Sequence, residues 1–134
     1  MRMLFWVLVL AGVLCWAQLI PAFLTGGLNN GRAWEGLDEA QRIMYASGIG
    51  DGIRLGARGT EKCGYEAKAE KYDVGGFTVS DIVHEMTVLF TDRENIRIPI
   101  VEAYEYSLEK LKGKHTKAEL EQIVIRMRQV AVKY

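Results

Sequence analysis

In the second half of the chain, apolar residues recur every three or four positions in three successive stretches, which is the spacing of one helix face. The first stretch begins at Thr78, with Asp81 in its first turn, where a carboxylate favours the helix dipole. The second begins at Pro99, whose missing N–H costs nothing in a first turn, and ends at Gly113. The third begins at Thr116, with a glutamate three residues on, which is a capping box. The residues predicted to face the core are Val79, Ile82, Val83, Met86, Leu89, Phe90, Ile100, Ala103, Tyr104, Ser107, Leu108, Leu111, Leu120, Ile123, Val124, Met127, Val130 and Ala131.

Two further helices are predicted nearer the N-terminus. The longer one spans residues 38–57 and begins with another capping box, Asp38 with Gln41. The short one begins at Thr25, and its apolar positions are Leu28, Trp34 and Leu37. No stretch alternates with period two for long enough to predict a strand. The expected fold is therefore all-α, a single small bundle of four to five short helices over residues 23–134.

The longer of these helices carries an unusual number of glycines, Gly48, Gly50, Gly52 and Gly56. Each costs a helix about 1 kcal/mol relative to alanine, so something must compensate. The favoured explanation is that small residues let the backbone of another helix approach closely. The alternative is that Asp51, flanked by two glycines, is presented to a ligand or partner. The glycine spacing does not match a dinucleotide or phosphate-loop motif.

The N-terminus has the layout of a secretory signal peptide. Arg2 precedes an unbroken apolar run over residues 3–17, and small residues at Ala17 and Ala22 offer two cleavage sites. The run is short for a membrane span, which needs about 20 residues, although an uncleaved anchor is the alternative. Residues 1–22 are therefore expected to be a signal peptide, and the mature protein to be periplasmic or secreted, with no stable membrane anchor.

Charge and cysteine content narrow the class of partner. The chain has 17 basic and 17 acidic residues, so it lacks the basic face that a nucleic-acid partner would require. With Cys15 in the leader, Cys63 is the only cysteine of the expected mature chain, and no disulfide can form within it. A single thiol in an oxidising compartment is buried, free or paired between chains. Cys63 is thus a candidate for an intermolecular disulfide in a homodimer.

Two polar segments are predicted to contact a protein partner. Residues 58–76 read as a long loop, and long loops in small domains often carry function. The second segment, residues 92–97, connects two helices and is rich in Asp and Asn, which favour turns. The candidate contact residues are Tyr65, Tyr72, Asp92, Arg93 and Arg97. The alternative for both segments is an ordinary solvated loop.

Signals for catalysis and metal binding are scarce. His84-Glu85 resembles part of a zinc-protease motif, but the second histidine is required at position 88, where valine stands. Both residues lie off the apolar stripe and are expected on a solvated face. The acidic row of the fourth predicted helix, Glu102, Glu105 and Glu109, is also expected to be solvated. We therefore expect no enzyme, no metal and no cofactor.

Four short motifs occur in order along the chain: Phe23-Leu24-Thr25-Gly26, Tyr45-x-x-Gly48-x-x-Asp51-Gly52, Gly76-Phe77-Thr78 and Asp92-Arg93-Glu94-Asn95-Ile96-Arg97-Ile98-Pro99-Ile100. In this order the chain resembles the type VI secretion amidase-immunity proteins of the Rap/Tai type, over residues 23–111. The resemblance implies a small helical periplasmic fold that binds a cell-wall-cleaving amidase toxin and blocks its active site. Family members usually carry paired cysteines, whereas the mature chain here has Cys63 alone.

Two functions are therefore expected, from different classes. The first is an exported, non-enzymatic protein-binding domain, an immunity protein or inhibitor whose partner is a peptidoglycan amidase. The second is a structural or stress-related periplasmic module that self-associates through its glycine-rich helix or through Cys63.

Overall fold

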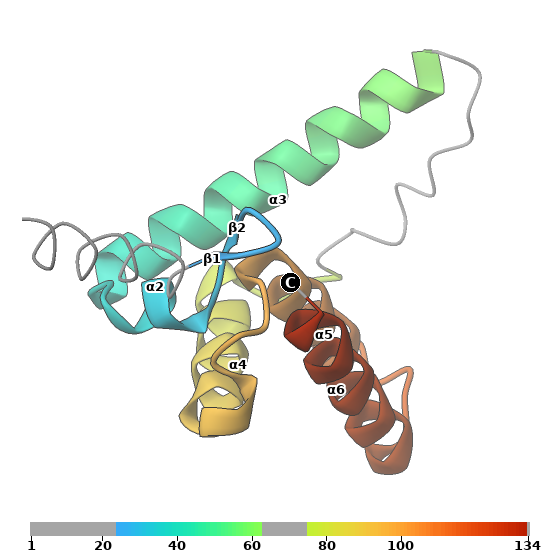
Figure 1. Cartoon of the computed structure of the whole chain (residues 1–134). Helices are drawn as coiled ribbons and strands as arrows, with labels where there is room; N and C mark the ends of the chain where they lie inside the picture. Colours follow the sequence, from blue (N-terminus) through green and yellow to red (C-terminus); the bar gives the residue numbers. More distant parts are fainter. Residues whose placement is uncertain (1–23, 63–74, 134) are drawn as a thin grey trace, which may run out of the picture.

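The computed structural model describes residues 24–62 and 75–133, with side chains described at all of these except 58–62. This part is mostly helical, as predicted, and it adds a small hairpin (Figure 1). In chain order the elements are β1 (Leu24–Thr25), β2 (Leu28–Asn29), α2 (Gly31–Glu35), α3 (Glu39–Lys62), α4 (Val79–Thr91), the 3-10 helix η3 (Arg93–Asn95), α5 (Ile100–Leu111) and α6 (Lys117–Val132). The expected leader, residues 1–22, lies outside the described residues.

Capping boxes start α3, α4 and α6, of which those of α3 and α6 were predicted. The Thr78 backbone N–H donates to Asp81 Oδ2 at 2.7 Å, and the Asp81 N–H donates to Thr78 Oγ1 at 3.2 Å. Thr116 and Glu119 repeat this exchange at 2.7 and 3.3 Å. At α3 the Asp38 N–H donates to the Gln41 side chain, and the Gln41 N–H donates back to Asp38. Each box satisfies amide groups that a helix start otherwise leaves without partners.

Acid is expected to weaken the starts of α4 and α6. Hydrogen bonds from Thr78 lower the pKa of Asp81 below its usual 3.8, and those from Thr116 lower the pKa of Glu119 below 4.5. A lowered pKa in the folded state adds stability above the unfolded-state value, and this stability is lost as pH falls through the folded value. We therefore expect the free energies of unfolding of the wild type and of an Asp81→Asn, Glu119→Gln variant, measured in urea, to differ most near neutral pH. A difference that persisted below both folded pKa values would contradict this account.

The prediction of a helix starting at Thr25 was wrong, as was the expectation of no strands. Gly26 and Gly27 take the positive φ values of 57° and 81°, which turn the chain back so that β1 pairs antiparallel with β2. The helix, α2, begins only after Asn30, whose side chain accepts from the Arg32 N–H at 3.0 Å. Asn30 also forms a bridge with Pro99, so the hairpin lies against the start of α5.

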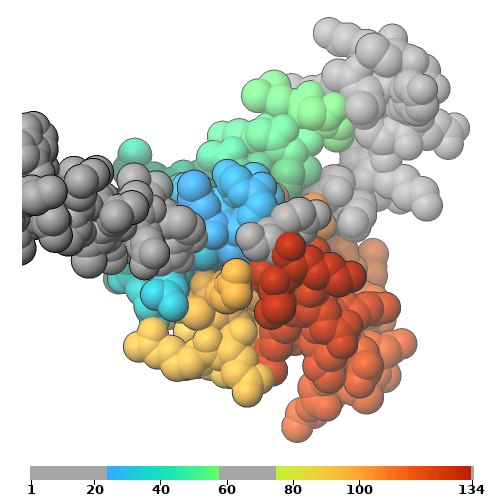
Figure 2. All heavy atoms as spheres, in the orientation of Figure 1, coloured from blue at the N-terminus to red at the C-terminus, as the bar shows by residue number. Residues whose placement is uncertain are grey.

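Helix α3 is longer than predicted. It begins next to Asp38, as expected, but continues to Lys62 instead of ending at Ala57, so the predicted loop at 58–76 starts at least five residues too early. Its C-terminal half stands out from the body of the protein formed by α4, α5 and α6 (Figures 1 and 2). The rest of the predicted loop, residues 63–74, lies outside the described residues.

The core lies where α3 and α5 pack against α4. The α4 side chains Ile82, Val83, Met86, Leu89 and Phe90 are all buried, as predicted. The prediction that the glycines of α3 let another helix backbone approach closely was wrong for the described residues. A Cβ on Gly50 would lie 2.8 Å from the Tyr104 hydroxyl of α5, whereas Gly48, Gly52 and Gly56 have no atom within 4 Å of such a position among the described residues. A side chain, not a helix backbone, therefore needs the space at Gly50.

Helix α6 is the least embedded of the long helices that follow residue 75. Its predicted core stripe is only half-buried at Leu120, Ile123, Val124 and Met127, and Ala131 is the one residue of α6 classed as buried. Val130, also predicted to be buried, is 42% exposed. The helix lies beside α5 (Figure 1) and contacts η3. Its residues Leu120, Val124 and Ile125 line an open groove on the side of α4.

Candidate functional site

The segment between α4 and α5, residues 92–99, is called the connector below, and its shape is held by side chains from several elements. Asp92 caps η3 by accepting from the Glu94 N–H at 3.0 Å. The amide of buried Asn95 donates to the Leu89 carbonyl at 2.8 Å, which satisfies a group near the end of α4. From the hairpin, the Thr25 hydroxyl donates to the Arg97 carbonyl at 2.6 Å. The connector is therefore a fixed loop between the hairpin and α6.

The three predicted contact residues of the connector do not share one side of it. Asp92 faces α6, where its carboxylate lies 2.6 Å from the Arg128 guanidinium. Arg93 faces α2 instead, with its guanidinium 2.8 Å from the Glu35 carboxylate and its side chain 79% exposed. Arg97 is exposed, and the structure fixes it through its backbone. The other predicted site residues, Tyr65, Tyr72 and Cys63, lie outside the described residues.

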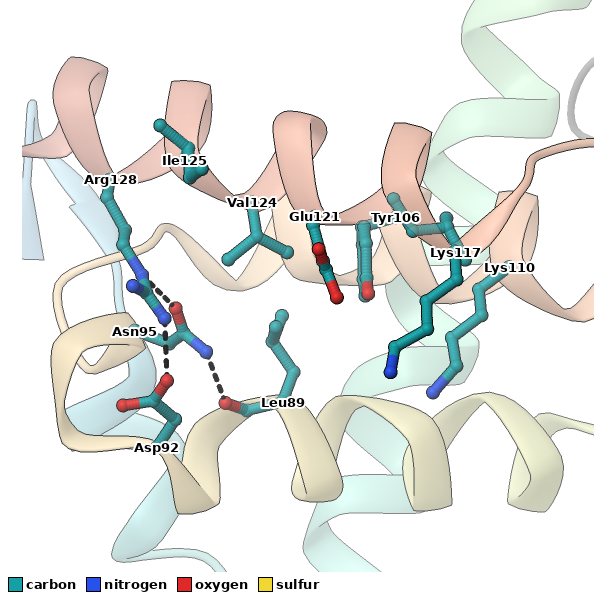
Figure 3. Close-up of a pocket in the computed structure, with 11 residues that line it drawn as sticks. Leu89, Asp92, Asn95, Tyr106, Lys110, Lys117, Glu121, Val124, Ile125 and Arg128 are labelled. Carbon is teal, nitrogen blue, oxygen red and sulfur yellow. Dashed lines mark hydrogen bonds and ion pairs between the residues drawn. The ribbon is translucent and has the colours of Figure 1, made fainter.

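An open groove of about 760 Å³ runs between α4 and α6, with α5 behind it (Figure 3). Leu89 of α4 and Val124 of α6 point toward one another across its middle. Of the predicted contact residues that the structure describes, Asp92, Arg93 and Arg97, only Asp92 lines it. The lining residues are Leu89, Asp92, Asn95, Tyr106, Lys110, Lys117, Leu120, Glu121, Val124, Ile125 and Arg128. The groove thus has an apolar middle and polar ends.

At one end of the groove Arg128 joins α6 to the connector. Its guanidinium pairs with Asp92 and with Glu94, and its Nε donates to the buried Asn95 Oδ1 at 2.7 Å. Sequence reasoning did not identify Arg128 or Asn95 as part of a site. The turn composition of the connector predicted an asparagine with local hydrogen bonds, but nothing in the sequence indicated that an arginine 33 residues later would meet it.

At the other end Lys110 and Lys117 both line the groove (Figure 3). Lys110 pairs with Glu85 of α4, so the expectation of a solvated Glu85 was wrong: its side chain is only 19% exposed. The adjacent His84 is exposed, as predicted. Tyr106 also lines this groove, and burial raises the pKa of its hydroxyl above the usual 10.0.

The acidic row of α5 is less solvated than predicted. Glu102, Glu105 and Glu109 are all half-buried. Burial, followed by the charge of Glu105, raises the pKa of Glu102. Glu109 lies 3.4 Å from the His115 imidazole. None of these three carboxylates lines the groove, so they do not extend the site.

Within residues 24–62 and 75–133 there is no group of three His, Cys, Asp or Glu side chains placed to hold a metal ion. The same residues contain no helix with the length and apolar character needed to cross a membrane. Among the described residues, the outer side of the connector and the groove are candidate binding surfaces. No protein-family model, curated protein or solved structure matches this chain.

Proposed function

We propose that this chain is an exported, non-enzymatic domain of a small helical bundle that acts by binding another protein through the outer side of its connector. The observation that carries the proposal is the pair of exposed arginines, Arg93 and Arg97, on a loop whose backbone is fixed from both ends. Arginine is enriched among the residues that contribute most to protein interfaces. A loop that is already ordered also loses little conformational entropy on binding.

The charge of this surface indicates the kind of partner. Arg93 has one exposed partner, Glu35, and an exposed ion pair of this kind contributes at most about 1 kcal/mol, so it can be exchanged for an interfacial carboxylate. Arg97 makes no ion pair among the described residues. The partner surface is therefore acidic. The resemblance to amidase-immunity proteins indicates the class of this partner, a peptidoglycan amidase. The outer side of the connector would then occlude the active site of the amidase.

A leader at residues 1–22 fits this proposal because a cell-wall amidase acts outside the cytoplasm. The proposed location is the periplasm or the exterior, with cleavage after Ala17 or Ala22. Mass spectrometry of the exported chain would give the site, and an intact Arg2 in the isolated protein would indicate an uncleaved anchor instead.

The test is a pull-down with the full chain, tagged at its C-terminus and exported by its own leader in the source organism. We expect a cell-wall amidase to be recovered in stoichiometric amount, and the purified chain to inhibit its cleavage of peptidoglycan. Recovery of the bait's own copies alone would contradict the proposed function.

Charge reversal at Arg93→Glu with Arg97→Glu is expected to weaken the complex at least about tenfold, which corresponds to about 1.4 kcal/mol. The measurement is the dissociation constant for the recovered partner by calorimetry. A Lys114→Glu, Arg126→Glu variant is the matched control, because it changes the net charge equally at two exposed positions away from the connector. Equal weakening by both variants would assign the effect to net charge and not to the connector.

The second function, a self-associating structural module, is favoured by one surface of α3. Met44 is 75% exposed and Leu55 is 66% exposed, and their spacing of 11 residues places them on one helix face. Gly48 and Gly52, with open space around them, lie between. If Leu55→Glu abolished self-association and no hydrolase were recovered, this function would replace the first.

A further inference from the structure

Helix α6 leaves an apolar surface uncovered beside the groove. Ile125 lines the groove and is 41% exposed, and Val124 and Leu120 beside it are half-buried. In contrast, Leu89 on the opposite wall is 8% exposed. Apolar surface of this kind gains about 25 cal/mol for each Å² that a partner covers. The groove is therefore a docking surface, and its charges identify what docks there.

The two ends of the groove differ in charge. At the C-terminal end of α6, two carboxylates, Asp92 and Glu94, surround one guanidinium, Arg128, which leaves an excess of negative charge. At the N-terminal end, Lys110 is already neutralised by Glu85, and Lys117 makes no ion pair among the described residues. Glu121 lies one turn further along and points into the groove (Figure 3). Lys117 and Arg128 are 11 residues apart, which is about 16 Å along a helix.

We infer that the groove docks a second copy of this chain, with the two α6 helices antiparallel about a two-fold axis near Val124 and Ile125. In this arrangement Lys117 of each copy reaches the Asp92 and Glu94 end of the other. Glu121 of each copy lies opposite the other's Arg128. A parallel arrangement would instead place like ends together, which costs free energy. Both ends are thus complementary in the antiparallel arrangement, which is an isologous dimer.

The dimer leaves the outer side of the connector open. Arg93 and Arg97 do not line the groove, so self-association through α6 and partner binding through the connector use different surfaces. The inference is therefore independent of the proposed function. It also differs from self-association through α3, because Met44 and Leu55 do not line the groove.

The test is sedimentation equilibrium of the full chain, exported and purified in reductant so that cysteines do not contribute. We expect a reversible dimer. Ile125→Glu and Lys117→Glu should each weaken it at least about tenfold. The control variants are Arg126→Glu, which lies on the opposite face of α6 nine residues from Lys117, and Leu55→Glu on α3; neither should change the dimer.

A charge swap gives the sharper result. Glu94→Lys alone should weaken the dimer, and Lys117→Glu combined with Glu94→Lys should restore it, because the two positions meet only between copies. Circular dichroism of each variant shows whether the helices are retained. A monomeric wild-type chain would overturn the inference. So would a dimer that is insensitive to Ile125→Glu, or a double variant no tighter than the single ones.

Discussion

Replacing Trp34 with alanine is expected to destabilise the protein by about 3–5 kcal/mol, the usual cost of removing a large aromatic side chain from a core. Trp34 is 1% exposed, and its ring centroid lies 6.3 Å from that of Phe90 in α4. Its Nε1 donates to the Thr87 hydroxyl at 3.3 Å, and the Arg42 guanidinium of α3 lies over its ring. One side chain thus joins α2 to both α3 and α4. The loss would be a large part of the 5–15 kcal/mol that stabilises a typical domain.

Urea unfolding followed by far-UV circular dichroism measures this effect. Leu55→Ala is the control, because Leu55 is 66% exposed and such surface changes usually stay within about 0.5 kcal/mol. Trp34→Phe should cost less than Trp34→Ala because it keeps an aromatic ring in the same space. If Trp34→Ala cost no more than Leu55→Ala, α2 would not be docked on α4 as the structure has it.

Local signals allowed much of the helical part to be predicted. Capping at Thr78 and Thr116 depends on residues three apart, so neighbouring letters in the sequence determine it. The apolar stripe of α4 was predictable for the same reason, because all of its residues except Val79 are buried. These features agree with the structure since local preference and tertiary packing favour the same conformation.

The hairpin and the length of α3 could not be predicted in the same way. Thr25 is a good helix cap by composition, but in the structure its hydroxyl bonds to the carbonyl of Arg97, 72 residues away. That contact and the bridge from Asn30 to Pro99 place the segment in a hairpin. In α3, glycine content lowers the expected helix stability, yet the helix continues past Ala57. No local pattern contains this information.

The site was predicted only in outline. The connector was identified from its turn residues, but its two sides become distinct only when α6 and α2 are in place. Arg128 approaches Asp92 from one side and Glu35 approaches Arg93 from the other. The groove could not be predicted, because the stripe of α6 reads like that of a fully buried helix. Only the position of α6 beside α5 shows that part of this stripe stays open.

Substituting Gly31 with alanine is expected to destabilise the protein by about 1–3 kcal/mol, the cost of overpacking a filled core. Gly31 is the first residue of α2 and is buried. A Cβ there would lie 2.5 Å from Phe90 Cδ1 and 3.0 Å from the Ile96 carbonyl oxygen. Phe90 is itself 3% exposed and the carbonyl belongs to the connector, so neither has room to move. The substitution therefore tests the contact that holds the connector against α2 and α4.

Gly48→Ala is the matched control for Gly31→Ala, because it adds the same methyl group to a helix where no described atom lies within 4 Å. Alanine lowers the conformational entropy of the unfolded chain, so Gly48→Ala should stabilise the protein by up to about 1 kcal/mol. If the two substitutions changed the free energy of unfolding in urea in opposite directions, this would establish that Gly31 is needed for packing and that Gly48 is not. A stable Gly31→Ala variant would show that α2 sits further from Phe90 than the structure has it. Because that shift would also move Glu35 relative to Arg93, it would change the surface through which the partner is proposed to bind.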